Sequence, residues 1–396
     1  MRILVHDYAG HPFQVQLSRA LARRGHAVLH AYCGSLPNTA HGAMRRLPGD
    51  PPTFEITGVR LRETLDKYAY VKRWRQENEY GRRIVAVTER FRPDVVLSGN
   101  TPLDAQRRLL DACRARDIRF VFWLQDLLGV ATHRVLRKKV PVVGEVVGRF
   151  YVRRERALLR RSDAVVMITG DFRPILRRAG LPDDRLHVIE NWAPLDEMPL
   201  RARDNDWARA HDLAGGRVLL YSGNLGMKHN PELLVRLARR FRDEPDVRLA
   251  VVSEGLGAEW LRERKAEGGL DNLRILGFQP FERFPDVLAS ADVLVALLEP
   301  DAGVFSVPSK VLSYLCAARP VLLAVPPENL AARIVTGQEA GLVTPPDDAG
   351  GFVAAAETLL ADAALRQRLG RNARAYAERT FAIERIADAF ERVLRG

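Results

Sequence analysis

Residues 221–234, YSGNLGMKHNPELL, join an apolar run to a helical pattern through a turn that carries two glycines and a lysine. The apolar run ends before Gly223, Lys228 follows, and Pro231 suits the first position of the helix. Backbone N–H groups at the start of a helix, beside a lysine, can hold an anion. The alternative is a loop whose glycines serve turn geometry alone.

Residues 299–320, EPDAGVFSVPSKVLSYLCAARP, repeat this arrangement. An apolar run ends at Glu299, and Lys310 stands in the first turn of the helix that follows, with Ser309 as its expected cap. A lysine there opposes the helix dipole, so a bound anion would explain its position. Together Lys228 and Lys310 predict a cradle for a diphosphate, in which each charge-assisted hydrogen bond contributes about 1.5–3 kcal/mol.

The elements that must position these lysines are short apolar strands that alternate with helical patterns. In the first half the expected strands cover residues 2–6, 27–32, 94–99, 118–124, 164–169 and 186–190. In the second half they cover residues 217–222, 247–253, 273–277, 292–297 and 320–325. Continuous apolar strands separated by helices indicate parallel sheets covered on both faces, so each half is expected to form a doubly wound Rossmann-type α/β domain.

The predicted organisation has two domains and a returning helix. Residues 1–192 form the first domain, residues 193–205 a charged, proline-containing linker, and residues 206–375 the second domain. Residues 376–396 are strongly helical, with a break near Thr380, and are expected to pack back on the first domain. Ligands of open α/β sheets bind at the carboxyl ends of the strands, which is where the turn after residue 222 lies.

The composition is that of an ordinary globular chain with an excess of positive charge. Its 396 residues are 47% hydrophobic and 28% charged, and the formal net charge is +12. This balance favours an acidic partner such as nucleic acid, anionic lipid or a phosphorylated substrate. Because no nucleic-acid-reading module is visible and only 7% of the residues are aromatic, no nucleic-acid partner is expected.

Neither a coenzyme nor a metal is expected. The sequence has no G-x-G-x-x-G after its first strand and no G-x-x-x-x-G-K-[ST], which argues against a dinucleotide and a P-loop. Cys33, Cys113 and Cys316 are far apart and form no C-x-x-C pair. The D-x-D pair Asp204 and Asp206 lies in an arginine-rich segment, where a solvated loop or a helix cap is the expected role.

The sequence carries no signal for export or for crossing a membrane. Its opening segment, MRILVHDYAG, is too short for a signal peptide and lacks a cleavage site. No apolar run approaches the ~20 residues of a membrane-spanning helix. We therefore expect a cytoplasmic protein, a compartment that also suits three dispersed cysteines.

Residues 133–161, HRVLRKKVPVVGEVVGRFYVRRERALLRR, mix arginine and lysine with valine and aromatic residues. This basic amphipathic pattern suits an anionic membrane surface, where each cation adds about 1 kcal/mol of attraction. We expect it to dock on the inner face of the cell membrane, with Arg153, Arg154, Arg160 and Arg161 among the residues responsible. The alternative is a solvated basic helix face.

Several segments, in this order, make almost the whole chain resemble a family-4 retaining glycosyltransferase of the GT-B fold. They are LSRALARRGHAV from residue 17, FWLQDLLG from 122, YSGNLGMKH from 221, VVSEGLGAEWLRE from 251, LRILGFQPFERFPDVLASADVLVAL from 273 and SVPSKVLSYLCAARPVLLA from 306. Their form leans toward the branch that builds bacterial capsule, O-antigen and exopolysaccharide, including amino-sugar and L-fucosamine-type transferases. The resemblance implies two Rossmann-like domains that face each other across a central cleft.

The resemblance also implies roles for individual residues. Lys228, Lys310 and Asp126 are the expected catalytic residues, with the lysines on the donor diphosphate and Asp126 near the donor sugar. The loop that faces them would be lined by Gly10 and His11. The expected donor-binding residues are Gly223, Asn224, Gly226, Glu254, Gly277, Phe278, Gln279, Glu299, Ser306, Ser309 and Ser313, of which Gly277, Phe278 and Gln279 would flank the base.

The sequence departs from the family where the ribose is held. The family pattern E-x7-E places its two glutamates at positions that Phe305 and Ser313 occupy here. Glu299, Asp301 and Ser313 are the residues that would share ribose recognition in a rearranged loop.

The implied reaction moves a sugar, hexosyl or N-acetylhexosaminyl, from a nucleotide donor, expected to be UDP-linked, to an acceptor hydroxyl with retention of configuration. The acceptor would be a lipid-linked glycan, and the donor phosphate would help to take its proton. Catalysis then consists largely of stabilising charge on the leaving diphosphate, for which no cofactor or metal is required. The alternatives are a sugar-nucleotide epimerase, a phosphorylase, a two-lobed ligand-binding protein and a basic nucleic-acid binder.

Overall fold

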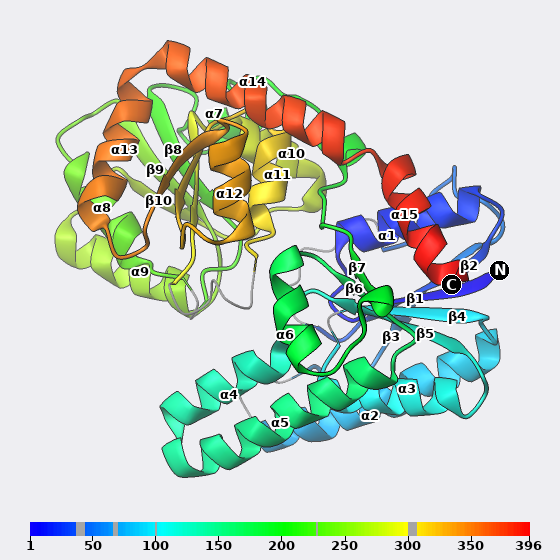
Figure 1. The fold of residues 1–396 in the computed structure, drawn as a ribbon. Coiled ribbons are helices and arrows are strands. Elements are labelled where there is room, and N and C mark those ends of the chain that lie inside the picture. The colour runs from blue at the N-terminus through cyan, green and yellow to red at the C-terminus, as the bar shows by residue number, and fades with distance from the viewer. Residues whose placement is uncertain (37–43, 66–69, 100, 227–228, 300–306) are drawn as a thin grey trace. The chain divides into compact units, whose positions relative to one another are not determined.

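The computed structural model describes residues 1–36, 44–65, 70–99, 101–226, 229–299 and 307–396. The chain forms two compact units, Met1–Asn191 with Ile383–Gly396, and Trp192–Ala382 (Figure 1). Each unit is built on a parallel sheet whose strands alternate along the chain with helices. The predicted fold class, a pair of Rossmann-like doubly wound domains, is confirmed.

The first unit has a seven-stranded sheet in the order β3-β2-β1-β4-β5-β6-β7. Its central strands are almost continuously apolar and buried, as expected for a parallel sheet covered on both faces. The strands are β1 (Arg2–Asp7), β2 (Ala27–Cys33), β3 (Phe54–Val59), β4 (Val95–Gly99), β5 (Arg119–Leu124), β6 (Ala164–Met167) and β7 (Leu186–Val188).

Helices cover both faces of this sheet (Figure 1). They are α1 (Pro12–Arg23), α2 (Tyr70–Phe91), α3 (Leu103–Arg114), α4 (Leu128–Lys139), α5 (Pro141–Arg161), α6 (Arg173–Arg178) and α15 (Ile383–Arg395), with short 3-10 turns η1 (Gly170–Phe172) and η2 (Asp183–Arg185). The C-terminal α15 packs beside α1. The ring of Phe390 lies 4.7 Å from that of Trp123 in β5, which anchors the end of the chain to the first sheet.

The second unit has a six-stranded sheet in the order β10-β9-β8-β11-β12-β13. Its strands are β8 (Arg217–Ser222), β9 (Val247–Val252), β10 (Leu273–Leu276), β11 (Val293–Leu297), β12 (Val321–Ala324) and β13 (Gly341–Thr344). Its helices are α7 (Asp206–Ala210), α8 (Glu232–Arg240), α9 (Leu256–Gly268), α10 (Phe284–Ala289), α11 (Lys310–Cys316), α12 (Leu330–Gly337), α13 (Ala349–Ala361) and α14 (Ala363–Thr380), with 3-10 turns η3 (Leu195–Glu197) and η4 (Phe281–Arg283).

The boundaries of the units differ in detail from the expected ones. The first unit ends at Asn191, and the segment expected to be a linker, 193–205, is counted with the second unit. The element that returns to the first unit begins at Ile383 rather than at residue 376. The reason is that α14 continues to Thr380 and packs against α11, so its last turn belongs to the second unit.

The basic segment 133–161 forms most of a helical hairpin, α4 and α5, rather than a single face. Three of the four arginines expected to dock on a membrane are engaged within the fold: Arg154 pairs with Asp104, Arg161 with Asp111, and Arg160 donates to the carbonyl oxygen of Ala179. Arg160 and Arg161 remain exposed and Arg154 is half-buried, and docking of this segment on a membrane stays a prediction. None of the helices in the described part of the chain has the length and apolar content needed to cross a membrane.

Candidate functional site

Most of the expected donor-binding residues in the second unit follow the ends of neighbouring strands. Gly223 follows β8, Glu254 follows β9, Gly277 follows β10 and Glu299 comes shortly after β11. These four strands are adjacent and parallel in the sheet. Because the carboxyl ends of parallel strands lie at one edge, the topology brings these positions together at the edge where open α/β sheets bind ligands.

Gly223 and Lys310 are in direct contact. Gly223 has a φ of 126°, a conformation that residues with a side chain rarely adopt. A Cβ atom at this position would lie 3.2 Å from Cε and 3.3 Å from Nζ of Lys310. The glycine thus allows both the turn after β8 and the passage of the lysine side chain across it.

Tyr221 holds the ammonium group of Lys310. Nζ lies 3.7 Å from the centre of the Tyr221 ring and donates to the Tyr221 hydroxyl, while the carbonyl oxygen of Asn224 lies 3.4 Å away. The hydroxyl itself donates to that carbonyl oxygen at 2.8 Å. Burial raises the pKa of Tyr221 well above its ordinary value, so the hydroxyl keeps its proton. A cation is therefore fixed at the end of β8.

Tyr314 in α11 ties the helix of Lys310 to the same strand. Its hydroxyl accepts from the N–H of Ser222 at 2.8 Å and donates to the carbonyl oxygen of Ser222 at 2.9 Å. Tyr314 lies one helical turn after Lys310, so these two bonds fix the part of α11 that carries the lysine. Sequence reasoning missed Tyr314; its only signal was the i+4 spacing from the lysine.

The turn after β8 is closed by further contacts. The N–H of Gly226 donates to Nδ1 of His229 at 3.0 Å. A Cβ atom on Gly257, in the first turn of α9, would lie 2.3 Å from the carbonyl oxygen of Leu225. The start of α9 therefore packs directly on this turn. The expected catalytic Lys228 lies outside the described residues.

The three residues expected beside the base form one small network with Glu254. Oε1 of Glu254 accepts from the N–H of Phe278 at 3.1 Å, and a Cβ atom on Gly277 would lie 3.2 Å from the same oxygen. The side chain of Gln279 donates to the carbonyl oxygen of Gly277 at 3.0 Å and accepts from the indole N–H of Trp207 at 2.9 Å. Glu254 thus sets the course of the loop after β10.

The ribose region is only partly described. Glu299 is half-buried after β11, and Ser313 is half-buried on α11. Ser309 precedes α11, but its side chain makes no capping hydrogen bond, so the expected cap is wrong. The physical reason is that its φ and ψ of −57° and −26° are already helical, whereas a capping residue needs an extended backbone. Asp301, Phe305 and Ser306 lie outside the described residues.

In the first unit, the expected residues Gly10 and His11 are organised by Asp7, the last residue of β1. The buried carboxylate of Asp7 accepts from the N–H of Gly10 at 3.0 Å, from the N–H of His11, and from Nδ1 of His11 at 3.1 Å. Gly10 has a φ of 76°, which glycine adopts without strain. Sequence reasoning missed Asp7, although a carboxylate at the end of a buried strand was a visible signal.

The charges around His11 favour its protonated form. Burial lowers the pKa of His11, but the charge and hydrogen bond of Asp7 and the charge of Asp126 outweigh it and raise that pKa above its ordinary value. Burial likewise raises the pKa of Asp7, and the charges of His11 and His30 together with the hydrogen bonds from His11 bring it below its ordinary value. Asp126, which follows β5, is thus electrostatically coupled to His11.

The remaining polar motifs have structural partners. Both carboxylates of the D-x-D pair contact Arg209, that of Asp204 at 2.9 Å and that of Asp206 at 3.2 Å. Both aspartates are exposed, as expected for a solvated segment, but the residue that caps α7 is Asn205 between them. No group of three or more His, Cys, Asp or Glu residues suited to a metal occurs within the described ranges. The three cysteines are buried free thiols.

Two protein families match the two halves of the chain. Residues 11–192 match the glycosyl transferase 4-like domain, and residues 216–362 match the glycosyl transferases group 1. The first match includes His11 and Asp126, and the second includes the segments of Gly223 and Lys310.

Two curated relatives each match about three fifths of the chain. WcaI of Escherichia coli strain K12, whose name describes a glycosyl transferase of colanic acid biosynthesis, is 27% identical over 246 residues, which are 61% of this chain and 59% of WcaI. An α-D-kanosaminyltransferase of Streptomyces kanamyceticus is 25% identical over 250 residues, or 61% of this chain and 62% of the relative. The matched region thus spans about three fifths of the length of these curated relatives.

A solved structure shows the same fold over the whole chain. HepE (Alr3699) of Anabaena in complex with UDP and glucose superposes with a TM-score of 0.73 at 16% identity and covers all of both chains. The two family matches together span most of this chain and agree with that fold. The protein therefore belongs to the glycosyltransferases of the GT-B fold.

Proposed function

We propose that the protein transfers a sugar from a UDP-sugar to an acceptor hydroxyl with retention of the anomeric configuration. The observation that carries the proposal is the ammonium group of Lys310, held on Tyr221 beside the glycine turn that ends β8. The donor diphosphate would lie along this turn, where backbone N–H groups and the lysine can neutralise it.

Charge stabilisation would supply most of the catalysis. As the bond from the sugar to the diphosphate breaks, negative charge grows on the leaving oxygen, and a fixed cation lowers the energy of that state. Lys310 is the residue proposed for this role, and Lys228, outside the described residues, remains a predicted second cation. In a front-face mechanism the donor phosphate takes the acceptor proton, so no protein nucleophile is assigned.

The choice of UDP and of the sugar class draws on the relatives. HepE is described in complex with UDP and glucose, and one curated relative is named for the transfer of an amino sugar. We propose a hexosyl or N-acetylhexosaminyl donor, with Glu254 and residues 277–279 beside the base. Glu299 and Ser313 are proposed to contact the ribose.

The first unit would handle the sugar and the acceptor. Asp7 holds His11 in one orientation, and a raised pKa favours the protonated imidazole at His11. We propose that the ring and the Asp126 carboxylate orient hydroxyl groups of the transferred sugar. In this scheme Asp7 is a positioning residue, because it would act through His11.

The name of WcaI and the basic surface of the first unit favour a lipid-linked glycan as the acceptor, in the assembly of capsule, O-antigen or exopolysaccharide. Such an acceptor lies at a membrane. We therefore propose that the protein works in the cytoplasm, peripherally attached to the inner face of the cell membrane.

A thermal-shift panel of UDP, GDP, ADP and dTDP on the wild type, Lys310→Ala and Arg262→Ala tests the donor site. Arg262 is exposed on α9, so its variant is a matched loss of one positive charge. UDP is expected to raise the melting temperature of the wild type and of Arg262→Ala, and to lose most of its effect in Lys310→Ala. A UDP-induced shift that persists in Lys310→Ala would contradict the proposed donor site. The absence of any shift with UDP in the wild type would contradict it as well.

The stereochemical outcome needs a separate measurement. Incubation with the UDP-sugar that gives the largest thermal shift and a lipid-linked acceptor should yield a glycoside whose anomeric configuration, measured by NMR, equals that of the donor. An inverted product would exclude retention. A new sugar nucleotide in the absence of acceptor would instead identify an epimerase.

A further inference from the structure

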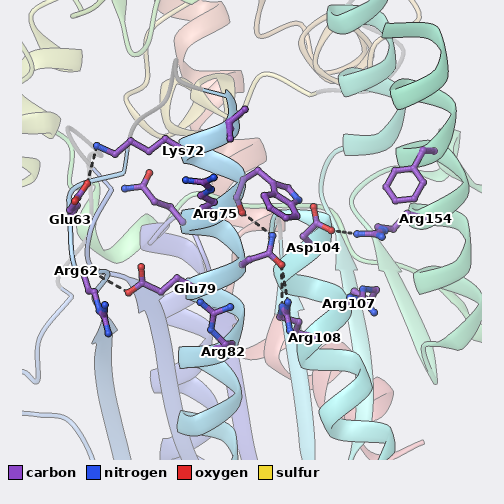
Figure 2. A pocket seen from close by; sticks show the side chains of 15 residues that line it. Arg62, Glu63, Lys72, Arg75, Glu79, Arg82, Asp104, Arg107, Arg108 and Arg154 are labelled. Carbon is purple, nitrogen blue, oxygen red and sulfur yellow. Dashed lines mark hydrogen bonds and ion pairs between the residues drawn. The ribbon is translucent and has the colours of Figure 1, made fainter. Parts of the chain in front are cut away.

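A cavity of about 1180 Å³ lies in the first unit among α2, α3 and α5. Figure 2 shows the basic side chains of α2 and α3 gathered around it, with Arg154 of α5 close by. None of its lining residues is one of those assigned above to the donor, the sugar or the acceptor. The cavity is therefore a feature for which glycosyl transfer gives no reason.

The lining carries more positive than negative charge. Its seven cationic residues are Arg62, Lys72, Arg75, Arg82, Arg107, Arg108 and Arg154, and its three carboxylates are Glu63, Glu79 and Asp104. Each carboxylate is already engaged, Glu63 by Lys72, Glu79 by Arg83 and Asp104 by Arg154. The excess of positive charge is therefore not neutralised by the carboxylates of the lining.

No carboxylate of the described residues lies within ion-pair distance of the guanidinium groups of Arg62, Arg75, Arg82 and Arg108, of which Arg108 is held by Asn78. Arg75 and Arg82 are the two of these that belong to α2. They are exposed on α2, seven positions or about two helical turns apart, so they lie on one side of the helix. Guanidinium groups bind phosphate through two parallel hydrogen bonds. Two such groups on one wall can hold a phosphate group.

The neighbouring helix α3 is held against α2 by close packing. The guanidinium of Arg108 donates to Oδ1 of Asn78 at 3.2 and 3.1 Å. A Cβ atom on Gly81 of α2 would lie 2.8 Å from Cδ of Arg108 and 3.0 Å from Cα of Ala105. The glycine thus lets α2 and α3 approach closely and fixes Arg108 at the cavity.

The cavity also has an apolar side. Trp74 is 50% exposed at its edge, and the exposed ring of Phe150 lies 4.4 Å from the guanidinium carbon of Arg154. Aromatic side chains that are half in water and beside cations are typical of the boundary between the head groups and acyl chains of a membrane.

Phe150 is also the last member of a stripe of exposed apolar residues along α5. Val142, Val143 and Val146 precede it at spacings of three and four, and Val142 is 82% exposed. The stripe is about 12 Å long at a rise of 1.5 Å per residue. It begins beside Arg137, Lys138 and Lys139, three basic residues at the end of α4. An apolar stripe of this length, flanked by cations, matches an element that lies in a bilayer interface.

We propose that the cavity binds the phosphate head group of an anionic phospholipid while the valine stripe of α5 enters the bilayer interface. Arg75 and Arg82 contact the phosphate, and Trp74 lies at the acyl boundary. The inference deepens the membrane attachment proposed above and identifies its ligand. It does not depend on the transfer reaction.

Vesicle flotation tests the proposal on the full chain. The vesicles contain phosphatidylcholine alone, or equal parts of phosphatidylcholine and phosphatidylglycerol. The cavity variant is Arg75→Glu/Arg82→Glu, and the matched control is Arg262→Glu/Arg371→Glu, which makes the same change in net charge at exposed residues of the second unit. Wild type is expected to float only with the anionic vesicles. The cavity variant should bind them at least about tenfold more weakly, while the control stays within about twofold.

Trp74 gives a second, local readout. Brominated phosphatidylglycerol should quench fluorescence in the wild type more than in Trp74→Phe, and Val142→Asp/Val146→Asp should abolish that difference. If the cavity variant and the control variant weaken vesicle binding equally, the proposal is overturned, because binding would then depend on overall charge and not on the cavity. If soluble glycerol phosphate stabilises the protein against unfolding but the protein does not bind vesicles, the proposal is overturned and the cavity is a site for free phosphate. The UDP thermal shift of the cavity variant should equal that of the wild type, which separates failure of this proposal from failure of the donor site.

Discussion

The side chain of Lys310 passes across the backbone of Gly223, so that a Cβ atom on residue 223 would lie 3.2 Å from Cε of the lysine. The turn after β8 and the first residue of α11 therefore constrain each other. The φ of 126° at Gly223 adds a second reason for glycine at this position, because that backbone conformation is strained for any residue with a side chain.

Gly223→Ala should lower both stability and donor binding. The positive φ predicts a loss of about 1–3 kcal/mol in the free energy of unfolding, measured by urea denaturation. Displacement of Lys310 by the new methyl group should also reduce the thermal shift by UDP. Gly215→Ala is the control, because no atom lies within 4 Å of a Cβ built there. A Gly223→Ala protein with wild-type stability and UDP response would show that the contact has no consequence.

Tyr221→Phe should weaken UDP binding with little change in fold. The variant keeps the ring beneath the ammonium group but removes the hydroxyl that accepts from Lys310 and donates to Asn224. We expect the Kd for UDP, measured by calorimetry, to rise by roughly three- to tenfold, the value of about one hydrogen bond.

Tyr314→Phe is the informative comparison, since its hydroxyl contacts the strand and not the lysine. Removal of that buried group leaves the N–H and the carbonyl oxygen of Ser222 without these bonds. The free energy of unfolding should then fall by about 1–3 kcal/mol. If Tyr221→Phe and Tyr314→Phe changed UDP binding equally, the two hydroxyl groups would not have the separate roles assigned here.

The sequence predicted the fold because the central strands of both sheets carry nearly continuous apolar runs. The strands it missed, β3 and β13, lie at sheet edges. β3 reads FEITGV with mostly half-exposed residues, and β13 is only four residues long. An edge strand is buried less completely, so its pattern is weaker than that of a central strand.

The site was predictable where it depends on local sequence and not where it depends on distant contacts. The glycine turn and Lys310 could be recognised from a strand–turn–helix pattern. Tyr314 could not, because its role comes from a contact with Ser222, 92 residues away. The pairing of Arg154 with Asp104, 50 residues apart, was equally hidden, because charge composition carries no information on which groups pair.

Glu155→Gln should stabilise the protein at neutral pH. The side chain is buried, and within the described residues its Oε1 has no hydrogen-bond partner. Burial is the main cause that raises the pKa of Glu155 to about 7, above the value of about 4.3 in an unfolded chain. The folded state therefore holds the proton more tightly, and stability falls as pH rises between these values by about 1.4 kcal/mol per pH unit.

Urea denaturation from pH 4 to pH 8 measures this effect. The stability of Glu155→Gln relative to the wild type should increase through the window and level off above pH 7. Glu259→Gln, at an exposed carboxylate of α9, should show a difference that does not change with pH. A constant difference for Glu155→Gln would mean that its carboxyl titrates normally.

Asp7→Asn should lower the pKa of His11. The carboxylate of Asp7 raises that pKa through its charge and a hydrogen bond at 3.1 Å, and an amide would keep an acceptor oxygen but lose the charge. NMR titration of the His11 ring, assigned with His11→Gln, should show the decrease. Asp117→Asn removes an exposed carboxylate from the same unit and should leave the titration unchanged.

The same variant tests whether His11 acts in the transfer. A protonated imidazole that donates to the sugar is lost as pH rises through the pKa of His11, so the alkaline limb of the kcat/KM profile should move to lower pH in Asp7→Asn. We expect kcat at neutral pH to fall by roughly tenfold, while the UDP thermal shift is unchanged because Lys310 and Tyr221 belong to the other unit. An alkaline limb that stays in place despite a lowered His11 pKa would mean that the ring contributes only structure, and Asp126 would then be the remaining candidate to orient the sugar.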